Sequence, residues 1–279
     1  MNRTETKSKA EALCELHQTG ETVVVPNAFD AASARVLEVA GFPTVATSSA
    51  AMAWTAGLPD GEVLSFEQAL ELHTRVARAV EVPVSLDFEG GYVGSGGIAA
   101  TIEALIDAGV AGVGLEDTNF GSADEAPLHD ADAHAELIAA AREAADRLDT
   151  PLFINGRTDL FFRNVGAAEE RAEEAARRLS LYVAAGADCA FAPGIADPAD
   201  IEFVVGRLDV PLNVVHLPTM PGIGALRDLG VGRITFGISF YLTALSAVET
   251  AARELKEGRV DPLSAAITLS PQSRRAFMA

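Results

Sequence analysis

The chain has 279 residues, a length that suits one α/β barrel and also allows two smaller domains. Forty acidic residues against 21 basic ones give a formal net charge of −19, which disfavours nucleic acid and anionic membranes as partners. No apolar run is long enough to span a membrane, and the charged first segment lacks a signal-peptide core, so the sequence predicts a cytoplasmic protein.

In chain order, an N-terminal helix is expected at about residues 5–19, followed by short β-branched runs that alternate with longer Ala-rich segments of helical spacing. The expected strands cover residues 22–28, 43–49, 83–89, 111–117, 151–157, 189–194, 211–216 and 233–237. The expected helices cover residues 29–40, 65–80, 97–108, 130–148, 167–185, 197–207, 221–229 and 239–256. Many of these helices end at a glycine, the preferred residue after a helix C-terminus.

Strand-then-helix units that follow one another without interruption are typical of a parallel (β/α)8 barrel of the TIM type. An open, doubly wound sheet is the alternative. The sequence therefore predicts an α/β protein with one domain over residues 1–279. Its barrel core covers about residues 20–256, and the tail at 257–279 adds to a C-terminal helical extension. Cys14 and Cys189 lie far apart, so neither a disulfide framework nor a thiolate metal site is expected.

Acidic residues follow two neighbouring predicted strands at the ends that form the active face of such a barrel. In "VSLDFE" the alternation of a strand places Asp87 and Glu89 on one face, and Glu116 ends the next strand in "GVGLED". Three inward carboxylates offer the oxygen ligands that Mg²⁺ or Mn²⁺ prefers. Helix capping or pairing with an arginine is the structural alternative. The sequence has no HExxH or CxxC motif, so zinc is not expected.

The fifth predicted strand ends in "NGRTD", where Asn155 and Arg157 share a face. A guanidinium binds a carboxylate or phosphate through two parallel hydrogen bonds, so Arg157 is a candidate substrate clamp. It could equally form a structural ion pair with Asp117 or Asp159.

Small residues follow the second predicted strand in "TSSAAMAWTAGLPDG", where Ser48, Ser49 and Ala50 could present backbone N–H groups to an anion. A tight loop without a ligand is the alternative. Asp60 could have no role beyond stabilising the turn that contains it. The run "GGYVGSGG" lacks the signatures of phosphate- and dinucleotide-binding loops, so a flexible turn is expected there. His216, at the end of the seventh predicted strand, is the one histidine expected near the barrel mouth, as a structural residue.

The motifs "PNAFDAASARVLEVAGF", "TSSAAMAWTAGLPDG", "SLDFEGGY", "GVGLED" and "NGRTD" together resemble the isocitrate lyase and phosphoenolpyruvate mutase superfamily over about residues 20–245. The resemblance implies a Mg²⁺-dependent barrel enzyme that acts on 2-oxo or 2-hydroxy carboxylates. It also implies a homo-oligomer, a dimer or tetramer, in which paired subunits exchange their last helix. Carried over by position, Ser48, Ser49, Ala50 and Arg157 bind the substrate, Asp87, Glu89 and Glu116 hold the metal with Asp60 nearby, and Arg157, Glu116 and Asp60 are the catalytic candidates.

The positions at which the sequence departs from the superfamily's motifs limit the reactions that are expected. The Lys-Lys/Arg-Cys-Gly-His segment of isocitrate and methylisocitrate lyases is replaced by "EDTNFGSADEAPLHDAD", which argues against both activities. Ser122 and Pro193 stand near the positions where phosphonate enzymes carry a lysine and a histidine. We therefore expect a lyase or decarboxylase that cleaves a C–C bond in a small oxo acid through a metal-stabilised enolate. The alternatives are a phosphonate mutase or hydrolase and a non-catalytic oxo-acid binder. The acid/base group stays open between metal-bound water, Tyr92 and the loop at 118–130, which is expected to close over the mouth.

Overall fold

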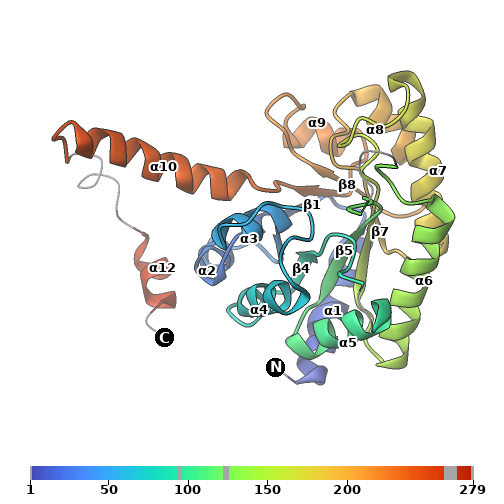
Figure 1. Ribbon diagram of the computed structural model, residues 1–279, viewed down its shortest axis with the longest axis horizontal. Helices are drawn as coiled ribbons and strands as arrows, with labels where there is room; N and C mark the ends of the chain where they lie inside the picture. Colours follow the sequence, from blue (N-terminus) through green and yellow to red (C-terminus); the bar gives the residue numbers. More distant parts are fainter. Residues whose placement is uncertain (1, 94–95, 122–125, 261–268, 278–279) are drawn as a thin grey trace.

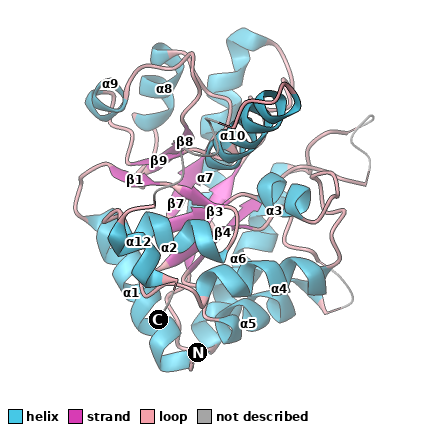
Figure 2. Ribbon diagram, turned by 90° about the vertical axis from the view of Figure 1, so that its left-hand side faces the viewer, coloured by secondary structure: helices cyan, strands magenta, loops and turns pink. Residues whose placement is uncertain are grey.

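A parallel sheet at the centre of the molecule is surrounded by helices (Figures 1 and 2). The computed structural model describes residues 2–93, 96–121, 126–260 and 269–277. The strands are β1 (Val23–Val25), β2 (Asn27–Ala28), β3 (Val45–Thr47), β4 (Val84–Asp87), β5 (Gly112–Glu116), β6 (Phe153–Arg157), β7 (Cys189–Phe191), β8 (Leu212–Val215) and β9 (Arg233–Thr235). Each predicted strand is found, with its ends shortened.

The first predicted strand is divided at Pro26, and this division closes the sheet. The piece before the proline, β1, pairs with β9, whereas the piece after it, β2, pairs with β3. Proline has no N–H to donate, but its carbonyl still accepts a hydrogen bond from the Ala46 amide at 2.9 Å. Because the pairing runs from β9 through β1 and β2 to β3, the predicted barrel is confirmed and an open sheet is wrong.

The predicted helices are confirmed, and among the described residues two further helices, α3 and α12, have no predicted range. The helices are α1 (Arg3–Gln18), α2 (Ala31–Val39), α3 (Ser49–Thr55), α4 (Phe66–Ala77), α5 (Gly97–Ala108), α6 (Ala131–Arg147), α7 (Arg171–Ala184), α8 (Pro198–Val205), α9 (Ile223–Asp228), α10 (Ser239–Lys256) and α12 (Pro271–Ala276), with a 3₁₀ turn, η1 (Ala168–Glu170), before α7. The segment read as a loop after the second predicted strand is α3, which begins where the Ser48 hydroxyl accepts a hydrogen bond from the Ala51 amide.

Helix α1 covers the end of the barrel at which the strands begin. Leu13 of α1 packs with Ala111, Phe153 and Cys189, which lie at or next to the starts of β5, β6 and β7. Burial of these side chains closes the barrel opposite the cavity described below.

Helix α10 extends away from the barrel (Figure 1). The last described helix, α12, packs against α2, where Arg35 Nη1 donates a hydrogen bond to the Ala276 carbonyl at 2.8 Å. No described helix is both long and apolar enough to cross a membrane.

Three buried histidines, His17, His73 and His134, are expected to make the fold sensitive to acid. Burial lowers the pKa of His17 to about 3 and those of His73 and His134 to about 4. In the unfolded chain each titrates near 6.5, so between pH 6.5 and 4 the unfolded state binds more protons. The three neutral histidines stabilise the folded state fully above pH 6.5, and this contribution is lost as the pH falls toward 4. The free energy of unfolding should fall by about 2 kcal/mol per histidine between pH 7 and 5.

Urea unfolding at pH 7, 6 and 5 measures this loss. The variant His73→Phe removes one titrating group and should flatten the pH dependence by about one third. His129 is exposed, so His129→Gln should leave it unchanged. Equal slopes for wild type and His73→Phe would contradict the prediction.

Candidate active site

A cavity of about 260 Å³ lies at the ends of the strands and continues into the barrel. Its walls carry the predicted Ser48, Ser49, Ala50, Asp60, Asp87 and Arg157, together with apolar residues such as Phe162 and Phe191. The C-terminal ends of the strands are where barrel enzymes place their catalytic groups. The cavity is therefore the candidate active site.

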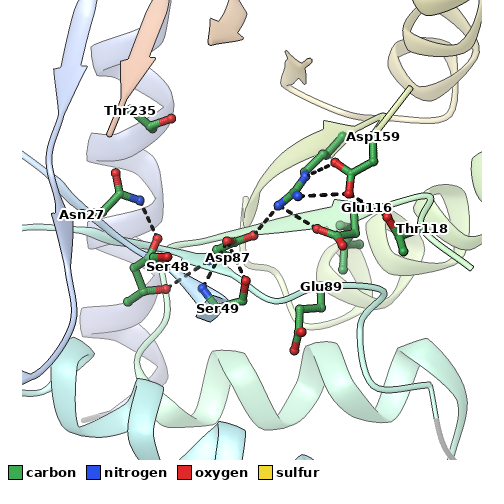
Figure 3. A network of polar contacts seen from close by, with 12 residues as sticks. Asn27, Ser48, Ser49, Asp87, Glu89, Glu116, Thr118, Asp159 and Thr235 are labelled. Carbon is green, nitrogen blue, oxygen red and sulfur yellow. Dashed lines mark hydrogen bonds and ion pairs between the residues drawn. The ribbon is translucent and has the colours of Figure 1, made fainter. Parts of the chain in front are cut away.

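Arg157, at the end of β6, binds three carboxylates at once. Its Nη1 lies 3.0 Å from Asp87 Oδ1 and 2.6 Å from Glu116 Oε2, while its Nε and Nη2 donate to both carboxylate oxygens of Asp159 at 2.6 and 3.1 Å. Figure 3 shows these three acids facing one point. Burial alone would lower the pKa of Arg157, but the charges of Asp159, Glu116 and Asp87 raise it well above the ordinary value. The guanidinium is therefore permanently charged and fixed in orientation.

Asp87 links this arginine to the segment after β3. Its Oδ2 accepts hydrogen bonds from the Ser49 amide at 3.1 Å and the Ser49 hydroxyl at 3.0 Å, and its own amide donates one to Thr47 Oγ1 at 3.1 Å. The Ser49 N–H that we expected to face an anion is thus bound by Asp87. Within the described residues, the amides of Ser48 and Ala50 make no such contact.

Glu89 is oriented differently from Asp87. Strand β4 ends at Asp87, and Glu89 has a positive φ of 51°, so the expected alternation does not continue to it. Its carboxylate accepts hydrogen bonds from the Gly61 amide at 2.8 Å, the Glu62 amide at 2.6 Å and the Tyr92 hydroxyl. In Figure 3 it points away from the acids around the arginine. Burial, more than the nearby Asp87 charge, raises its pKa.

Glu116, at the end of β5, is buried beside the arginine without complete hydrogen bonding. Its Oε2 is 2.6 Å from Arg157 Nη1, but this contact lacks hydrogen-bond geometry and the atom has no hydrogen-bond partner. Burial raises the pKa of Glu116 well above its ordinary value, and the charge of Arg157 opposes this only in part. The protein therefore balances the negative charge of this buried carboxylate only in part.

Asp60 lies on the exposed rim of the cavity, after α3. Partial loss of hydration, followed by the charges of Asp87 and Glu89, raises its pKa to about 6. The same charges show that the rim is strongly electronegative. A cation placed among these carboxylates would be attracted.

Oxygen ligands fit a hard divalent cation, but the described residues do not form a complete metal cage. No group of three or more His, Cys, Asp or Glu side chains within the described ranges has the spacing of a metal centre. Asp87 and Glu116 are brought together with Arg157 between them, whereas Glu89 is occupied by the amides of the Gly61 turn. A divalent cation would bind the Glu116 oxygen that has no hydrogen-bond partner, and it would balance the excess of negative charge.

The predictions for the remaining positions have different outcomes. Arg157 pairs with Asp159, as one alternative proposed, whereas Asp117 pairs with Arg178. His216 contacts the ring of Phe236, with ring centroids 5.9 Å apart. Pro193 lines the cavity, but Ser122 and part of the loop at 118–130 lie outside the described residues, as does part of "GGYVGSGG".

The interior polar residues of the cavity were largely missed by sequence reasoning. Asn213 on β8 and both Arg233 and Thr235 on β9 line it. Period-two alternation would have found them, since Asn213 and Val215 share one face and Arg233 and Thr235 share another. Figure 3 shows Asn27 and Thr235 on the side of the polar network opposite Asp159.

Comparisons with known proteins identify relatives of the chain. Oxaloacetate decarboxylase 1 of Pseudomonas putida is 31% identical over 251 residues, 87% of this chain and 83% of its own. A candidate lyase/mutase of Burkholderia cenocepacia is 33% identical with a TM-score of 0.89, over 99% of this chain and 98% of that one. The structure of 2,3-dimethylmalate lyase is 26% identical, with a TM-score of 0.80, over 98% and 94%. Residues 13–256 match the family model for phosphoenolpyruvate phosphomutase, and the chain therefore belongs to that family, within the isocitrate lyase/phosphoenolpyruvate mutase superfamily.

Proposed function

We propose that the protein is a Mg²⁺-dependent lyase or decarboxylase that cleaves a C–C bond in a small 2-oxo or 2-hydroxy carboxylic acid. The observation that carries this proposal is the Arg157 guanidinium, fixed by Asp87, Glu116 and Asp159 at the wall of a cavity at the strand ends. The names of two relatives, an oxaloacetate decarboxylase and a dimethylmalate lyase, support this reaction class.

The metal would be held by Asp87 and Glu116, with Glu89 and Asp60 binding its water ligands, and Mn²⁺ could replace Mg²⁺. When bound, the ion supplies a Lewis acid for the negative charge that develops on the substrate oxygen next to the cleaved bond. Glu89 is assigned the indirect role because the Gly61 and Glu62 amides already bind its carboxylate.

The side chains around the cavity would orient the substrate and exclude water. Arg157 would bind the substrate carboxylate through its planar fork, and the segment Ser48–Ala50 would bind the adjacent oxygen. Phe191 and Phe162 lie 5.4 and 6.0 Å from the Arg157 guanidinium carbon, and their rings would shield the charged contact from solvent. Asp60, on the rim, is a catalytic candidate that would exchange a proton with the substrate.

A phosphonate enzyme is the second candidate, favoured by the matching family model and by a 36% identical structure described as a phosphonomutase of Burkholderia cenocepacia. Pro193 speaks against it, because this cavity residue offers no donor for a phosphoryl oxygen.

A pyruvate-release assay with Mg²⁺ on oxaloacetate, dimethylmalate, methylisocitrate and phosphonopyruvate distinguishes the two when phosphoenolpyruvate formation from phosphonopyruvate is followed as well. Pyruvate release from a C–C substrate, abolished by EDTA, is the expected result. Turnover of phosphonopyruvate alone, to pyruvate by a hydrolase or to phosphoenolpyruvate by a mutase, would establish the second candidate instead. Oxalate binding without any turnover would identify a binder that lacks catalysis.

Oxalate binding should depend on Mg²⁺ and on Asp87. We expect Mg²⁺ to strengthen oxalate binding, measured by isothermal titration calorimetry, and Asp87→Asn to weaken it by about 10-fold or more, because the change removes one charged ligand. The matched control is Asp188→Asn, since Asp188 also pairs with an arginine, Arg142, but lies outside the cavity. Unchanged Mg²⁺-dependent binding in Asp87→Asn would contradict the metal site.

The protein is further proposed to be a homo-oligomer in which α10 packs against a second copy. None of the described residues of this 18-residue helix is buried, although Phe240, Leu242, Leu245, Val248 and Leu255 are large and apolar. Sedimentation should give a dimer or tetramer, and Val248→Asp should lower the assembled fraction. A monomeric wild type would contradict this proposal.

A further inference from the structure

Arg233, at the start of β9, is a fully buried cation without a counter-charge. Only 1% of the residue is exposed, and its Nε atom has no hydrogen-bond partner. In the part of the chain that the structure describes, no carboxylate forms an ion pair with it. Arginine stays protonated in proteins, and an isolated buried charge costs several kcal/mol. Such a residue requires a partner from outside the described chain.

The side chains that touch Arg233 are neutral. Its Nη1 lies 3.3 Å from His17 Nε2, while His17 Nδ1 bonds the Leu13 carbonyl at 2.8 Å, so Nδ1 carries the proton and Nε2 accepts. The low pKa of His17, about 3, keeps this ring uncharged. The Cys189 thiol donates to the Pro211 carbonyl, and burial raises its pKa to about 12. The Phe153 ring, 5.6 Å from the guanidinium carbon, carries no net charge.

A second unused donor faces the same space. Asn213 of β8 is the register partner of Arg233, and both line the cavity. Thr235 Oγ1 lies 3.3 Å from Asn213 Oδ1 and 3.2 Å from the Val214 carbonyl, its two possible acceptors, whereas the buried Asn213 Nδ2 has no partner. Asn213 is 1% exposed. The inner cavity thus presents a guanidinium N–H and an amide N–H, each unpaired, on adjacent strands.

Two unpaired donors beside an uncompensated positive charge are complementary to an anion. Water could accept their hydrogen bonds but would leave the charge of Arg233 unbalanced. Asn155, which lines the cavity from β6, also has a buried oxygen without a partner. It could be satisfied by a water molecule in the same space, or its amide could be turned to donate.

We propose that the inner end of the cavity is a small-anion site, in which Arg233 Nε and Asn213 Nδ2 bind a halide ion or one carboxylate group. This site does not rest on the proposed lyase reaction, because it uses β8 and β9 rather than the Arg157 network. The anion could be a free inorganic ion or the remote carboxylate of a bound dicarboxylic acid. Both sources present the same chemistry to the two donors.

Crystals of the full chain, prepared in two conditions, separate these sources. In bromide without organic acids, an anomalous peak within hydrogen-bond distance of Arg233 Nε and Asn213 Nδ2 would establish a free-ion site. In succinate without halide, a carboxylate at the same donors would establish the organic source. Either result supports the proposal, whereas water alone in both crystals would overturn it.

Melting temperatures test the site in solution. At equal ionic strength, chloride at saturating concentration should raise the melting temperature by about 5 °C relative to a bulky sulfonate such as HEPES if it is the ion bound, and succinate should do so if a carboxylate is bound. Asn213→Leu and Arg233→Met should each lose that increment, whether or not their own stability changes. Arg207→Met, which alters an exposed arginine of the α8 end, should keep it. An increment that persists in both cavity variants, or its absence for both anions in wild type, would overturn the proposal.

Discussion

Replacing Arg157 by lysine is expected to lower kcat/KM by about 100-fold or more while leaving the barrel folded. The guanidinium holds Asp159 with two of its nitrogens and reaches Asp87 and Glu116 with a third. A lysine ammonium preserves the positive charge, but its single nitrogen cannot keep all three carboxylates in place. It also cannot bind a substrate carboxylate through two parallel hydrogen bonds.

Lysine is the informative substitution because a neutral residue would confuse two effects. With methionine at 157, three carboxylates would share a buried site without their cation, and the fold itself would lose about 3–5 kcal/mol. In the lysine variant the melting temperature should change little compared with the kinetics. A loss of activity can then be assigned to the site.

The measurement is steady-state kinetics on the substrate found in the pyruvate-release panel, with KM and kcat determined separately. The oxalate dissociation constant provides a second readout that needs no turnover. Arg142→Lys is the matched control, because Arg142 also forms an ion pair, with Asp188, yet lies away from the cavity. If Arg157→Lys and Arg142→Lys reduce kcat/KM equally, Arg157 is not the substrate clamp.

The position of Arg157 and Asp87 could be predicted from sequence because two periodicities agree. The alternation of apolar runs with Ala-rich segments predicts the barrel, and the barrel assigns function to residues at the strand ends. Asp87 and Arg157 are the last residues of β4 and β6, so they are still governed by strand alternation. Both line the predicted cavity.

Glu89 shows where this reasoning stops. It lies two residues beyond β4, in a left-handed conformation that strand alternation does not describe, and its direction is set by the Gly61 and Glu62 amides. Those amides belong to a turn 27 to 28 residues earlier in the chain. No local pattern encodes such a contact. Helix α3 was missed for a related reason, since seven small and mixed residues are too short to show a helical period.

Arg233 was missed because a single arginine at a strand start is ordinarily interpreted as a surface residue. Its burial depends on α1, whose His17 covers it from more than 200 residues away in the sequence. Only the folded barrel brings the two together. Sequence alternation could have placed Arg233 on the inner face. It could not have predicted that no acidic side chain among the described residues lies beside it.

Removing the Asp117 carboxylate is expected to destabilise the fold by about 3–5 kcal/mol. Asp117 is completely buried just after β5 and binds four donors. These donors are Thr158 Oγ1 at 2.7 Å, the Asp159 amide at 2.9 Å, Arg178 Nη1 at 3.0 Å and the Tyr182 hydroxyl at 2.7 Å. In Asp117→Ala each of them loses its acceptor, and the Arg178 charge is left largely buried without its innermost partner.

Urea unfolding at pH 7.5 measures the effect as a lower midpoint at an unchanged slope. Tyr182→Phe, which removes one of the four hydrogen bonds and keeps the ring, should cost only about 1 kcal/mol. The difference between the two variants isolates the charge from the packing. Because the Asp159 amide is one of the donors, Asp117→Ala should also loosen the carboxylate that orients Arg157, and oxalate binding should weaken even where the variant is fully folded. Equal destabilisation by Asp117→Ala and Tyr182→Phe would show that the buried charge does not hold this end of the barrel together.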